Sequence, residues 1–274
     1  MTTKADALEP TAEPVFIQQA QKLVDYLKSL PFEQLKTLLA CNENLAQLNY
    51  QRYQTMDLHA GTNPALVSYE GIQYQYMAPR VFTYEYFDYA QEHVRILSGL
   101  YGILRPFDAI VPYRLEMQAK LKTDFCKNLY DFWGESLYQE LTKDSNIIIN
   151  LASDEYSKAI KKYVQPTDRF ITCRFCEQGD GKLVEKGVYV KMARGEMVRY
   201  MAEQDLQVPE DMKSFTGLGY GFSQEHSTEN LYTFIRFLLF PSKKNVIFVF
   251  KNKWQKDQKC LKLVLAEQKR TIKD

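Results

Sequence analysis

The sequence predicts a mixed α/β protein of one domain, and three observations carry that prediction. The run Asn146–Leu151 is short and mostly apolar, with a helix expected directly after it, which is typical of a strand covered on both faces. Segments 15–29 and 32–50 carry apolar side chains at helical spacing. No repeat and no long flexible linker is found before residue 240. We therefore expect a single compact domain in which helices surround a sheet.

The first half of the chain is predicted to be mostly helical. Apolar residues recur at three- and four-residue intervals through most of it. One stretch differs, because it mixes Tyr, Val, Ile and Gly around Glu70–Gly71 and predicts a short strand pair. The elements expected here are helices at 15–29, 32–50, 84–97 and 128–143 and the strand pair within 63–78.

Strands and helices are expected to alternate in the second half. A helix begins at about Ser153, after the buried strand. Residues 170–175 and 182–190 flank Gly179–Gly181 and predict a β-hairpin. A helix at 192–204 follows the hairpin directly.

Composition is that of a globular protein with an uneven charge. The 274 residues are 45% apolar and 14% aromatic, which favours a packed core and excludes a disordered chain. The formal net charge is +1, but residues 242–274 hold ten Lys/Arg and three Asp/Glu, a local charge of +7 that leaves −6 on the remainder. A nucleic-acid surface on the main body would therefore be a local basic patch.

We expect a cytoplasmic protein that does not cross a membrane. The first residues carry no apolar signal region, and no uninterrupted apolar run approaches the roughly 20 residues that span a bilayer. Five cysteines, an odd number, fit a reducing compartment. Cys173 and Cys176 have metal-ligand spacing, but no second Cys or His pair accompanies them, so we expect no metal site. No phosphate-binding loop, dinucleotide fingerprint or catalytic triad order is visible, and we expect no cofactor.

A glycine turn within residues 97–108 is the most informative stretch. Ser98, Gly99 and Gly102 allow a tight turn that brings the backbone close to another surface. Exposed N–H groups in such a turn, with a helix behind it, would bind a phosphate oxygen without reading sequence, as in a helix-hairpin-helix element. Arg105 follows shortly. The alternative is an ordinary turn between packed helices, because Gly-x-x-Gly turns are common.

Charged residues cluster at the predicted starts of two helices. Asp154 and Glu155 follow the buried strand, where open α/β sheets place ligands, although together with Ser153 they would also cap the helix. Lys191 and Arg194 bracket the start of the helix at 192–204, where the helix dipole disfavours cations. They indicate an anionic ligand or an acidic partner such as Asp154 and Glu155 across a cleft, or a solvated basic pair.

A third charged pair extends this constellation. Arg114 and Glu116 share one face if their segment is extended, and form either part of a site or a surface ion pair. With the residues of the two helix starts, they suit acid/base work on an anionic substrate, provided that all of them meet in one cleft. A further hypothesis is iron ligation by Asp154, Glu155 and Glu116, but no His-plus-carboxylate spacing supports it.

Six motifs indicate a family resemblance. In chain order they are Leu97–Pro106, Pro112–Met117, Tyr130–Gly134, Asn150–Tyr156, Lys191–Gly195 and Phe215–Tyr220. They resemble motifs that occur in the same order in the bacterial YaaA peroxide stress proteins. The resemblance covers roughly residues 3–236.

The resemblance implies a cytoplasmic protein that limits free iron during hydrogen peroxide stress and so protects DNA from Fenton damage. It also implies a curved mixed sheet, and binding to double-stranded DNA through the helix-hairpin-helix and a positively charged cleft. We expect a monomer. No enzymatic reaction comes with the resemblance, so an enzyme acting on an anionic small molecule stays the alternative. The residues expected to contact DNA are Ser98, Gly99, Leu100, Gly102, Arg105, Lys191 and Arg194.

Both ends of the chain depart from the family pattern. Family members begin with an apolar strand and a lysine, so the resemblance implies that one strand and one cleft lysine are missing here. Family members end soon after Arg236, whereas 38 further residues follow in this chain. We therefore assign residues 1–236 to the domain and expect the basic extension 237–274 to lie outside the fold, with both ends arising either from errors in gene prediction or from the choice of the cloned segment.

Overall fold

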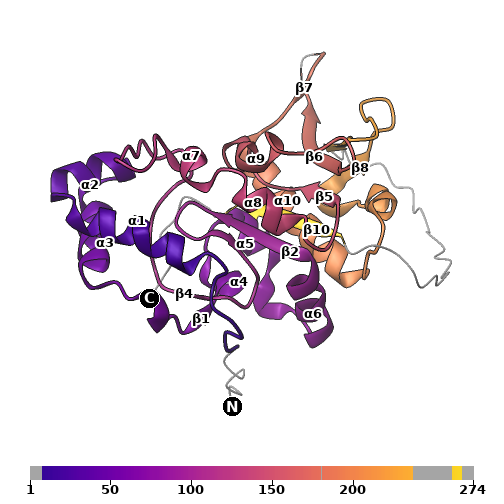
Figure 1. The fold of residues 1–274 in the computed structure, drawn as a ribbon. Coiled ribbons are helices and arrows are strands. Elements are labelled where there is room, and N and C mark those ends of the chain that lie inside the picture. Colours follow the sequence, from indigo (N-terminus) through magenta and orange to yellow (C-terminus); the bar gives the residue numbers. More distant parts are fainter. Residues whose placement is uncertain (1–7, 180, 237–260, 267–274) are drawn as a thin grey trace.

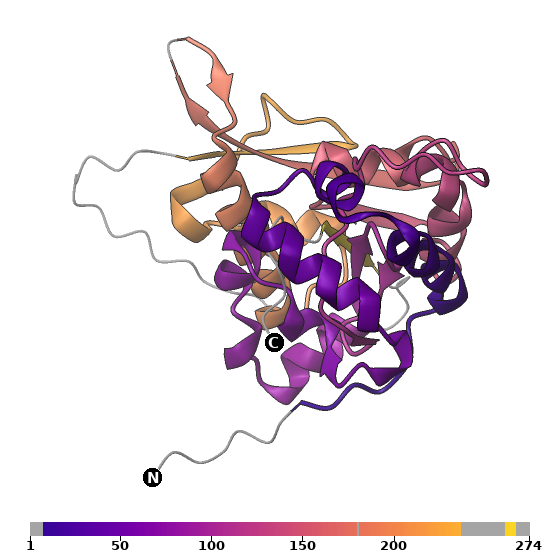
Figure 2. The ribbon, with the colours of Figure 1, turned by 90° about the vertical axis from the view of Figure 1, so that its left-hand side faces the viewer.

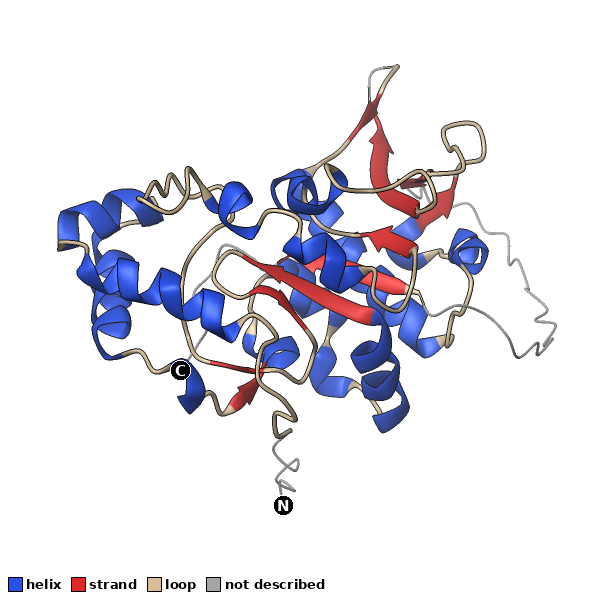
Figure 3. Cartoon of the chain, viewed as in Figure 1, coloured by secondary structure: helices blue, strands red, loops and turns tan. Residues whose placement is uncertain are grey.

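A mixed sheet lies at the centre of the structure, with helices packed around it (Figures 1 and 3). The structure is a computed structural model that describes residues 8–179, 181–236 and 261–266. Its α-helices are α1 (Ile17–Ser29), α2 (Phe32–Leu39), α3 (Glu43–Thr55), α4 (Ala65–Ser68), α5 (Ile72–Met77), α6 (Tyr84–His93), α7 (Leu129–Trp133), α8 (Ser136–Leu141), α9 (Asp154–Lys161) and α10 (Gly187–Glu203). Its strands are β1 (Asn63–Pro64), β2 (Val94–Ser98), β3 (Gly102–Leu104), β4 (Ala109–Ile110), β5 (Ile147–Asn150), β6 (Arg169–Gln178), β7 (Leu183–Val184), β8 (Tyr220–Phe222), β9 (Leu231–Arg236) and β10 (Lys262–Ala266).

The sheet has a parallel centre and antiparallel edges. Its strand order is β3-β2-β10-β5-β6-β9-β8, with β7 paired to β6. Strands β2, β10, β5, β6 and β9 run parallel to one another, whereas β3, β7 and β8 pair antiparallel. Every residue of β2 and β10 is buried, so both faces of the sheet are covered there. The mixed α/β fold and the single domain are therefore confirmed.

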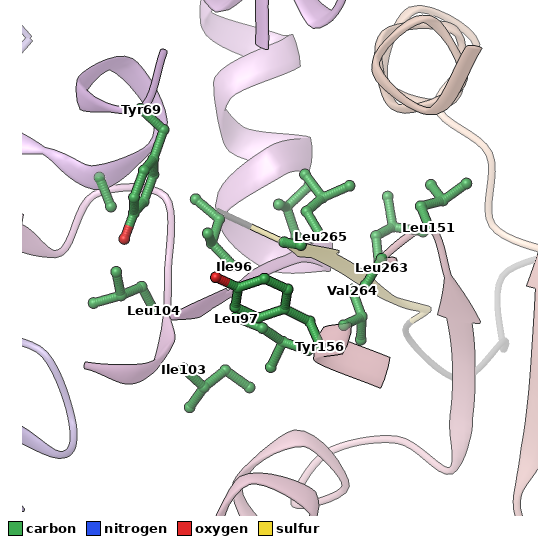
Figure 4. Packing of buried hydrophobic residues seen from close by; sticks show 14 of the residues in the cluster. Tyr69, Ile96, Leu97, Ile103, Leu104, Leu151, Tyr156, Leu263, Val264 and Leu265 are labelled. Atoms are coloured by element: carbon green, nitrogen blue, oxygen red, sulfur yellow. The ribbon is translucent and has the colours of Figure 1, made fainter. Parts of the chain in front are cut away.

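Side chains from β2 and β10 alternate between the two faces of the sheet. Leu265 pairs in register with Ile96, and Val264 pairs with Arg95 on one side and Asn150 on the other. Figure 4 shows Ile96 and Leu265 on one face of the sheet, and Leu97 and Tyr156 on the opposite face. The core is thus continuous across these two strands.

Strand β10 corrects the expectation for the basic extension. Residues 262–266 occupy an interior position between β2 and β5, so this part of 237–274 belongs to the fold. The physical reason is the apolar run Leu263–Leu265, which suits a strand buried on both faces. Residues 237–260 and 267–274 lie outside the described residues.

Helices α1, α2 and α3 form a group beside the sheet, and Figure 2 shows them facing the viewer. The helix predicted at 15–29 is confirmed as α1. The one predicted at 32–50 is divided, because Ala40 adopts a left-handed conformation and Asn42 then caps α3 by accepting a hydrogen bond from the Leu45 N–H group. The helix predicted at 128–143 is divided at Gly134.

One predicted element is wrong and two are only partly correct. Apart from β1, residues 63–78 form α4 and α5 rather than a strand pair, because Tyr74 and Met77 bury one side of a helix. The helix predicted at 84–97 ends at His93, and the fully buried run that follows is β2. The second hairpin strand is only β7, since α10 begins at Gly187. Figures 1 and 2 show the β6–β7 hairpin projecting from the body.

Candidate functional site at the carboxyl edge of the sheet

The glycine turn connects two strands instead of two helices. Residues 97–108 contain the end of β2, the turn and β3, so they do not form a helix-hairpin-helix. The stretch from Ser98 to Gly102 is buried. The Ser98 hydroxyl accepts hydrogen bonds from the backbone N–H groups of Leu100 and Tyr101, at 3.2 and 3.0 Å. These N–H groups are therefore already satisfied inside the protein.

Both glycines of the turn allow close packing. A Cβ atom added at Gly99 would lie 2.2 Å from the Leu115 carbonyl oxygen. Gly102 has a φ of +74°, and an added Cβ would lie 2.8 Å from the Trp133 ring. The Trp133 indole also donates a hydrogen bond to the Gly99 carbonyl at 3.1 Å. The sequence thus identified a close approach correctly, but the approaching surface is the protein itself.

Arg105 lies beyond the turn with an exposed side chain. Its guanidinium is 3.9 Å from a Glu140 carboxylate oxygen. Its backbone N–H group donates to the Asp108 carboxylate at 2.8 Å. Burial raises the pKa of Asp108 to about 6, although the Arg105 hydrogen bond opposes the shift.

The two acidic residues after β5 contact different neighbours. The Ser153 side chain makes no capping hydrogen bond to α9, so the expected cap is not formed. The Glu155 carboxylate accepts a hydrogen bond from the Gln118 backbone at 3.3 Å, and its carbonyl accepts one from the Tyr130 hydroxyl at 2.9 Å. Asp154 is exposed at the first position of α9.

Lys191 and Arg194 lie within a helix and not at its start. Helix α10 begins at Gly187, which places both residues one to two turns inside it. Gly195 sets the position of the helix, because an added Cβ would lie 2.0 Å from the Gln73 carbonyl oxygen of α5. Lys191 is exposed and Arg194 is half-buried.

Arg194 is a desolvated cation at this edge of the sheet. It forms no hydrogen bond or ion pair with any residue of the described ranges, and its Nε atom is fully buried. Burial lowers the pKa of Arg194, while Glu185, Asp154 and Cys173 act in the opposite direction. Arg194 therefore lies within electrostatic range of Asp154. Burial also raises the pKa of Cys173 to about 12, so that thiol stays protonated.

The ion pair between Arg114 and Glu116 is present. The guanidinium of Arg114 is 2.7 Å from a Glu116 carboxylate oxygen, and the Tyr53 hydroxyl donates to the Arg114 carbonyl at 2.9 Å. The same segment continues to Gln118, the backbone partner of Glu155. The first turn of α9 thus contacts this segment through Glu155, and its Asp154 is within electrostatic range of Arg194.

Sequence reasoning missed the tyrosines beside this site. The Tyr69 and Tyr113 hydroxyls are 2.7 Å apart, and Tyr113 also bonds to the Ser98 hydroxyl. The Tyr74 hydroxyl donates to the Ala266 carbonyl, at the end of β10, at 3.3 Å. Tyr113 is buried, and no spacing pattern in the sequence links it to Tyr69 or Tyr74.

Two other features are absent from the described part of the chain. Residues 8–179, 181–236 and 261–266 hold no group of three or more His, Cys, Asp or Glu side chains placed to bind a metal ion. Within the same ranges, no helix has the length and apolar character needed to cross a bilayer.

Comparison with known proteins decides the family. A family model described as peroxide stress protein YaaA matches residues 1–226. The chain belongs to the YaaA family. It is 55% identical over 236 residues to a UPF0246 protein of Desulfitobacterium hafniense, covering 86% of this chain and 94% of that one. UPF0246 proteins of Agathobacter rectalis and Pediococcus pentosaceus are 49% and 48% identical, with the same coverage of this chain and 95% and 94% of theirs.

Four of the six YaaA motifs contact one another in space, and the fifth lies within electrostatic range of the fourth. Gly99 of the first motif packs on Leu115 of the second and accepts the indole hydrogen bond of the third. Tyr130 of the third motif contacts Glu155 of the fourth, and the fourth contributes Asp154 to the surroundings of Arg194 in the fifth. Motifs scattered over about 100 residues of a YaaA protein thus form one connected region beside the carboxyl ends of β2 and β5.

Proposed function

We propose that this YaaA-family protein binds an anionic small molecule at the carboxyl end of β5, with Arg194 as the anchor. The observation that carries the proposal is the half-buried guanidinium with a fully buried, unpartnered Nε. A buried cation without a partner is costly, and an anion would satisfy it. The first-turn N–H groups of α9, which the Ser153 side chain leaves uncapped, favour the same charge.

The neighbouring residues would divide the remaining roles. Asp154 is exposed and within electrostatic range of Arg194, so we assign it the role of an acid or base toward a bound ligand. Lys191 adds an exposed positive charge one turn earlier on α10. Arg114 and Glu116 hold the adjoining segment through their ion pair. This arrangement supports an enzyme acting on an anionic substrate.

Calorimetric titration with inorganic phosphate and with a nucleoside monophosphate tests this proposal. We expect Arg194→Met to weaken binding at least about 10-fold, because a charge-assisted hydrogen bond contributes about 1.5–3 kcal/mol. The variant should unfold at an equal or higher denaturant concentration, since it removes an unpaired buried charge. Arg199→Met is the matched control on the same helix, where Arg199 is 2.6 Å from Glu196. Equal affinities of the wild type and Arg194→Met would overturn the proposal.

A second proposal is binding to the phosphate backbone of double-stranded DNA, with a consequent limit on free iron and Fenton damage. The family's description as peroxide stress proteins favours it. One structural observation also favours it: α9 and its end carry Lys158, Lys161 and Lys162, all exposed and none in an ion pair with a described carboxylate. Arg105 offers a further exposed cation. In both proposals the protein acts in the cytoplasm as a monomer.

Fluorescence anisotropy with a random-sequence duplex across a salt series tests the DNA proposal. Replacing Lys158, Lys161 and Lys162 by Ala should weaken binding equally for all sequences and lower the salt slope by about one unit for each phosphate that the variant no longer neutralises. Lys182→Ala, an exposed position on the β6–β7 hairpin, is the control. Unchanged affinity and slope in the triple variant would refute this surface. Free iron in peroxide-treated cells that carry each variant tests the cellular effect.

A further inference from the structure

The position of β10 in the sheet differs from its position in the chain. Along the chain, the parallel strands of the described residues appear as β2, β5, β6, β9 and β10. In the sheet their order is β2-β10-β5-β6-β9. The last strand of the chain therefore lies between the first two.

We propose that this fold is a circular permutation of a doubly wound sheet in which β10 is the topological first strand. If β10 is counted first, β2 becomes the second strand and β5, β6 and β9 the third to fifth. The order then reads 2-1-3-4-5, which is one of the common orders of doubly wound α/β proteins. The antiparallel strands β3, β7 and β8 are additions to this parallel sheet.

The contacts of β10 are those of an interior strand. Its Cα register matches Val94–Leu97 on one side and Ile148–Asn150 on the other. The Leu151 N–H group donates to the Val264 carbonyl at 3.0 Å, which extends the ladder past β5. At the start of the strand, the buried Lys262 ammonium donates to the Glu92 carbonyl at 2.9 Å. Without β10, strands β2 and β5 would both lose their hydrogen-bonding partner in the middle of the sheet.

The permutation predicts where a ligand enters. In the 2-1-3-4-5 order, connections leave the first and third strands in opposite directions, and ligands bind in the crevice at the carboxyl ends of those two strands. Here these ends are Ala266 of β10 and Asn150 of β5. Tyr74 contacts the first end, and Asp154 with Arg194 lies beyond the second. This placement makes β10 one wall of the proposed anion site. The permutation rests on the proposed function only for the class of ligand.

A permuted chain tests the inference. It begins at Lys259, runs through Asp274 into Met1 and ends at Arg236. The join between Ala266 and Leu8 then holds the eight residues that follow Ala266 and the seven that precede Leu8. Such a segment reaches about 50 Å when extended, so no linker is added. We expect a circular dichroism spectrum equal to that of the natural chain and a single cooperative unfolding transition.

A second permutant and a point variant separate the possible failures. A chain opened at Gly181, in the exposed β6–β7 turn, has the same join and keeps residues 237–258 in place. If it folds and the Lys259 permutant does not, β10 is not the first strand. If neither folds, the join is not tolerated, and the inference is equally overturned. In the natural full-length chain, Leu265→Ala should lower the urea midpoint, whereas the exposed Val184→Ala should not.

The ligand readout distinguishes this inference from the proposed function. A folded Lys259 permutant that binds phosphate as the natural chain does supports both. If the permutant and the natural chain both fold but neither binds phosphate, the permutation is supported and the anion site is refuted. A folded permutant that loses the phosphate binding of the natural chain overturns the role of β10 as a wall of the site.

Discussion

At the scale of single residues, burial decides which charged groups are available for function. Arg194 and Asp108 are both desolvated, but they differ in their partners. Asp108 accepts a hydrogen bond from the Arg105 backbone, so its position has a structural explanation. Arg194 has no hydrogen-bond or ion-pair partner among the described residues, which is why the anion proposal is centred on it. Cys173 shows that a shifted pKa alone does not indicate a functional group, because its buried thiol is held in the unreactive protonated form.

The raised pKa of Asp108 predicts a distinct pH dependence of stability. The carboxyl group has a pKa of about 6 in the folded state and an ordinary pKa of 3.8, so the folded state binds more protons between these values. Stability from this group is therefore present at low pH and is lost as pH rises from about 4 to 6, by about 3 kcal/mol. Asp108→Asn keeps an acceptor for Arg105 and removes the charge. In urea unfolding from pH 4 to 7.5, the free energy of unfolding of the variant should rise relative to that of the wild type through this pH window. A constant difference would contradict the assignment.

At the scale of elements, a glycine allows two helices to pack backbone against backbone. Gly195 of α10 packs directly on the backbone of α5, with the Gln73 carbonyl and the Met77 N–H group as neighbours. This contact fixes the rotation of α10 and so the direction in which Arg194 projects. The motif Lys191–Gly195 therefore combines a packing residue with a candidate binding residue.

Substitution of Gly195 should separate the two helices. A Cβ 2.0 Å from the Gln73 carbonyl oxygen must displace α5 or α10, because that oxygen belongs to the backbone and not to a flexible side chain. We expect Gly195→Ala to destabilise the protein by about 1–3 kcal/mol, the usual cost of overpacking. Gly187→Ala in the same helix is the control, since nothing lies within 4 Å of its added Cβ. It should be neutral or stabilising by up to about 1 kcal/mol. Thermal unfolding of both variants measures the contrast, and equal melting temperatures would refute it.

The elements that could be predicted from the sequence are those whose burial is one-sided and local. Helix α1 shows its apolar face at regular intervals, and β5 is a compact apolar run before a polar helix start. Strand β2 could not be separated from the preceding helix, because its two buried faces remove the alternation that identifies strands. The burial of Gly99 depends on Leu115 and Trp133, contacts that no local pattern contains.

The candidate site could be predicted only in its choice of residues. The sequence singled out Arg194 and Asp154, but it placed Arg194 at a helix start, whereas α10 begins two turns earlier, at Gly187. The direction of Glu155 did not follow from the sequence, since its partner Gln118 belongs to a segment without regular structure. Neither did the contact of Tyr74 with Ala266, which joins residues 192 positions apart.

At the scale of the whole molecule, the sheet depends on a strand that lies far from its neighbours in sequence. Strand β10 contributes buried residues to the common core and pairs with β2 and β5 along their length. Parallel pairing between such distant segments forms late, because the chain must first close a long loop. Until then, the facing edges of β2 and β5 are unpaired, which favours association with other chains.

Truncation after Arg236 should therefore destroy the fold even though it spares every YaaA motif. The shortened chain loses β10, and with it the hydrogen-bonding partner of two interior strands and five buried residues. We expect no cooperative unfolding transition and aggregation through the exposed strand edges. The matched control replaces residues 237–257 by a Gly/Ser segment of equal length and keeps β10, so it should unfold cooperatively. Circular dichroism during urea titration compares the two, with light scattering as the measure of aggregation. A truncated chain that unfolds with the same midpoint as the natural one would show that β10 contributes nothing to stability.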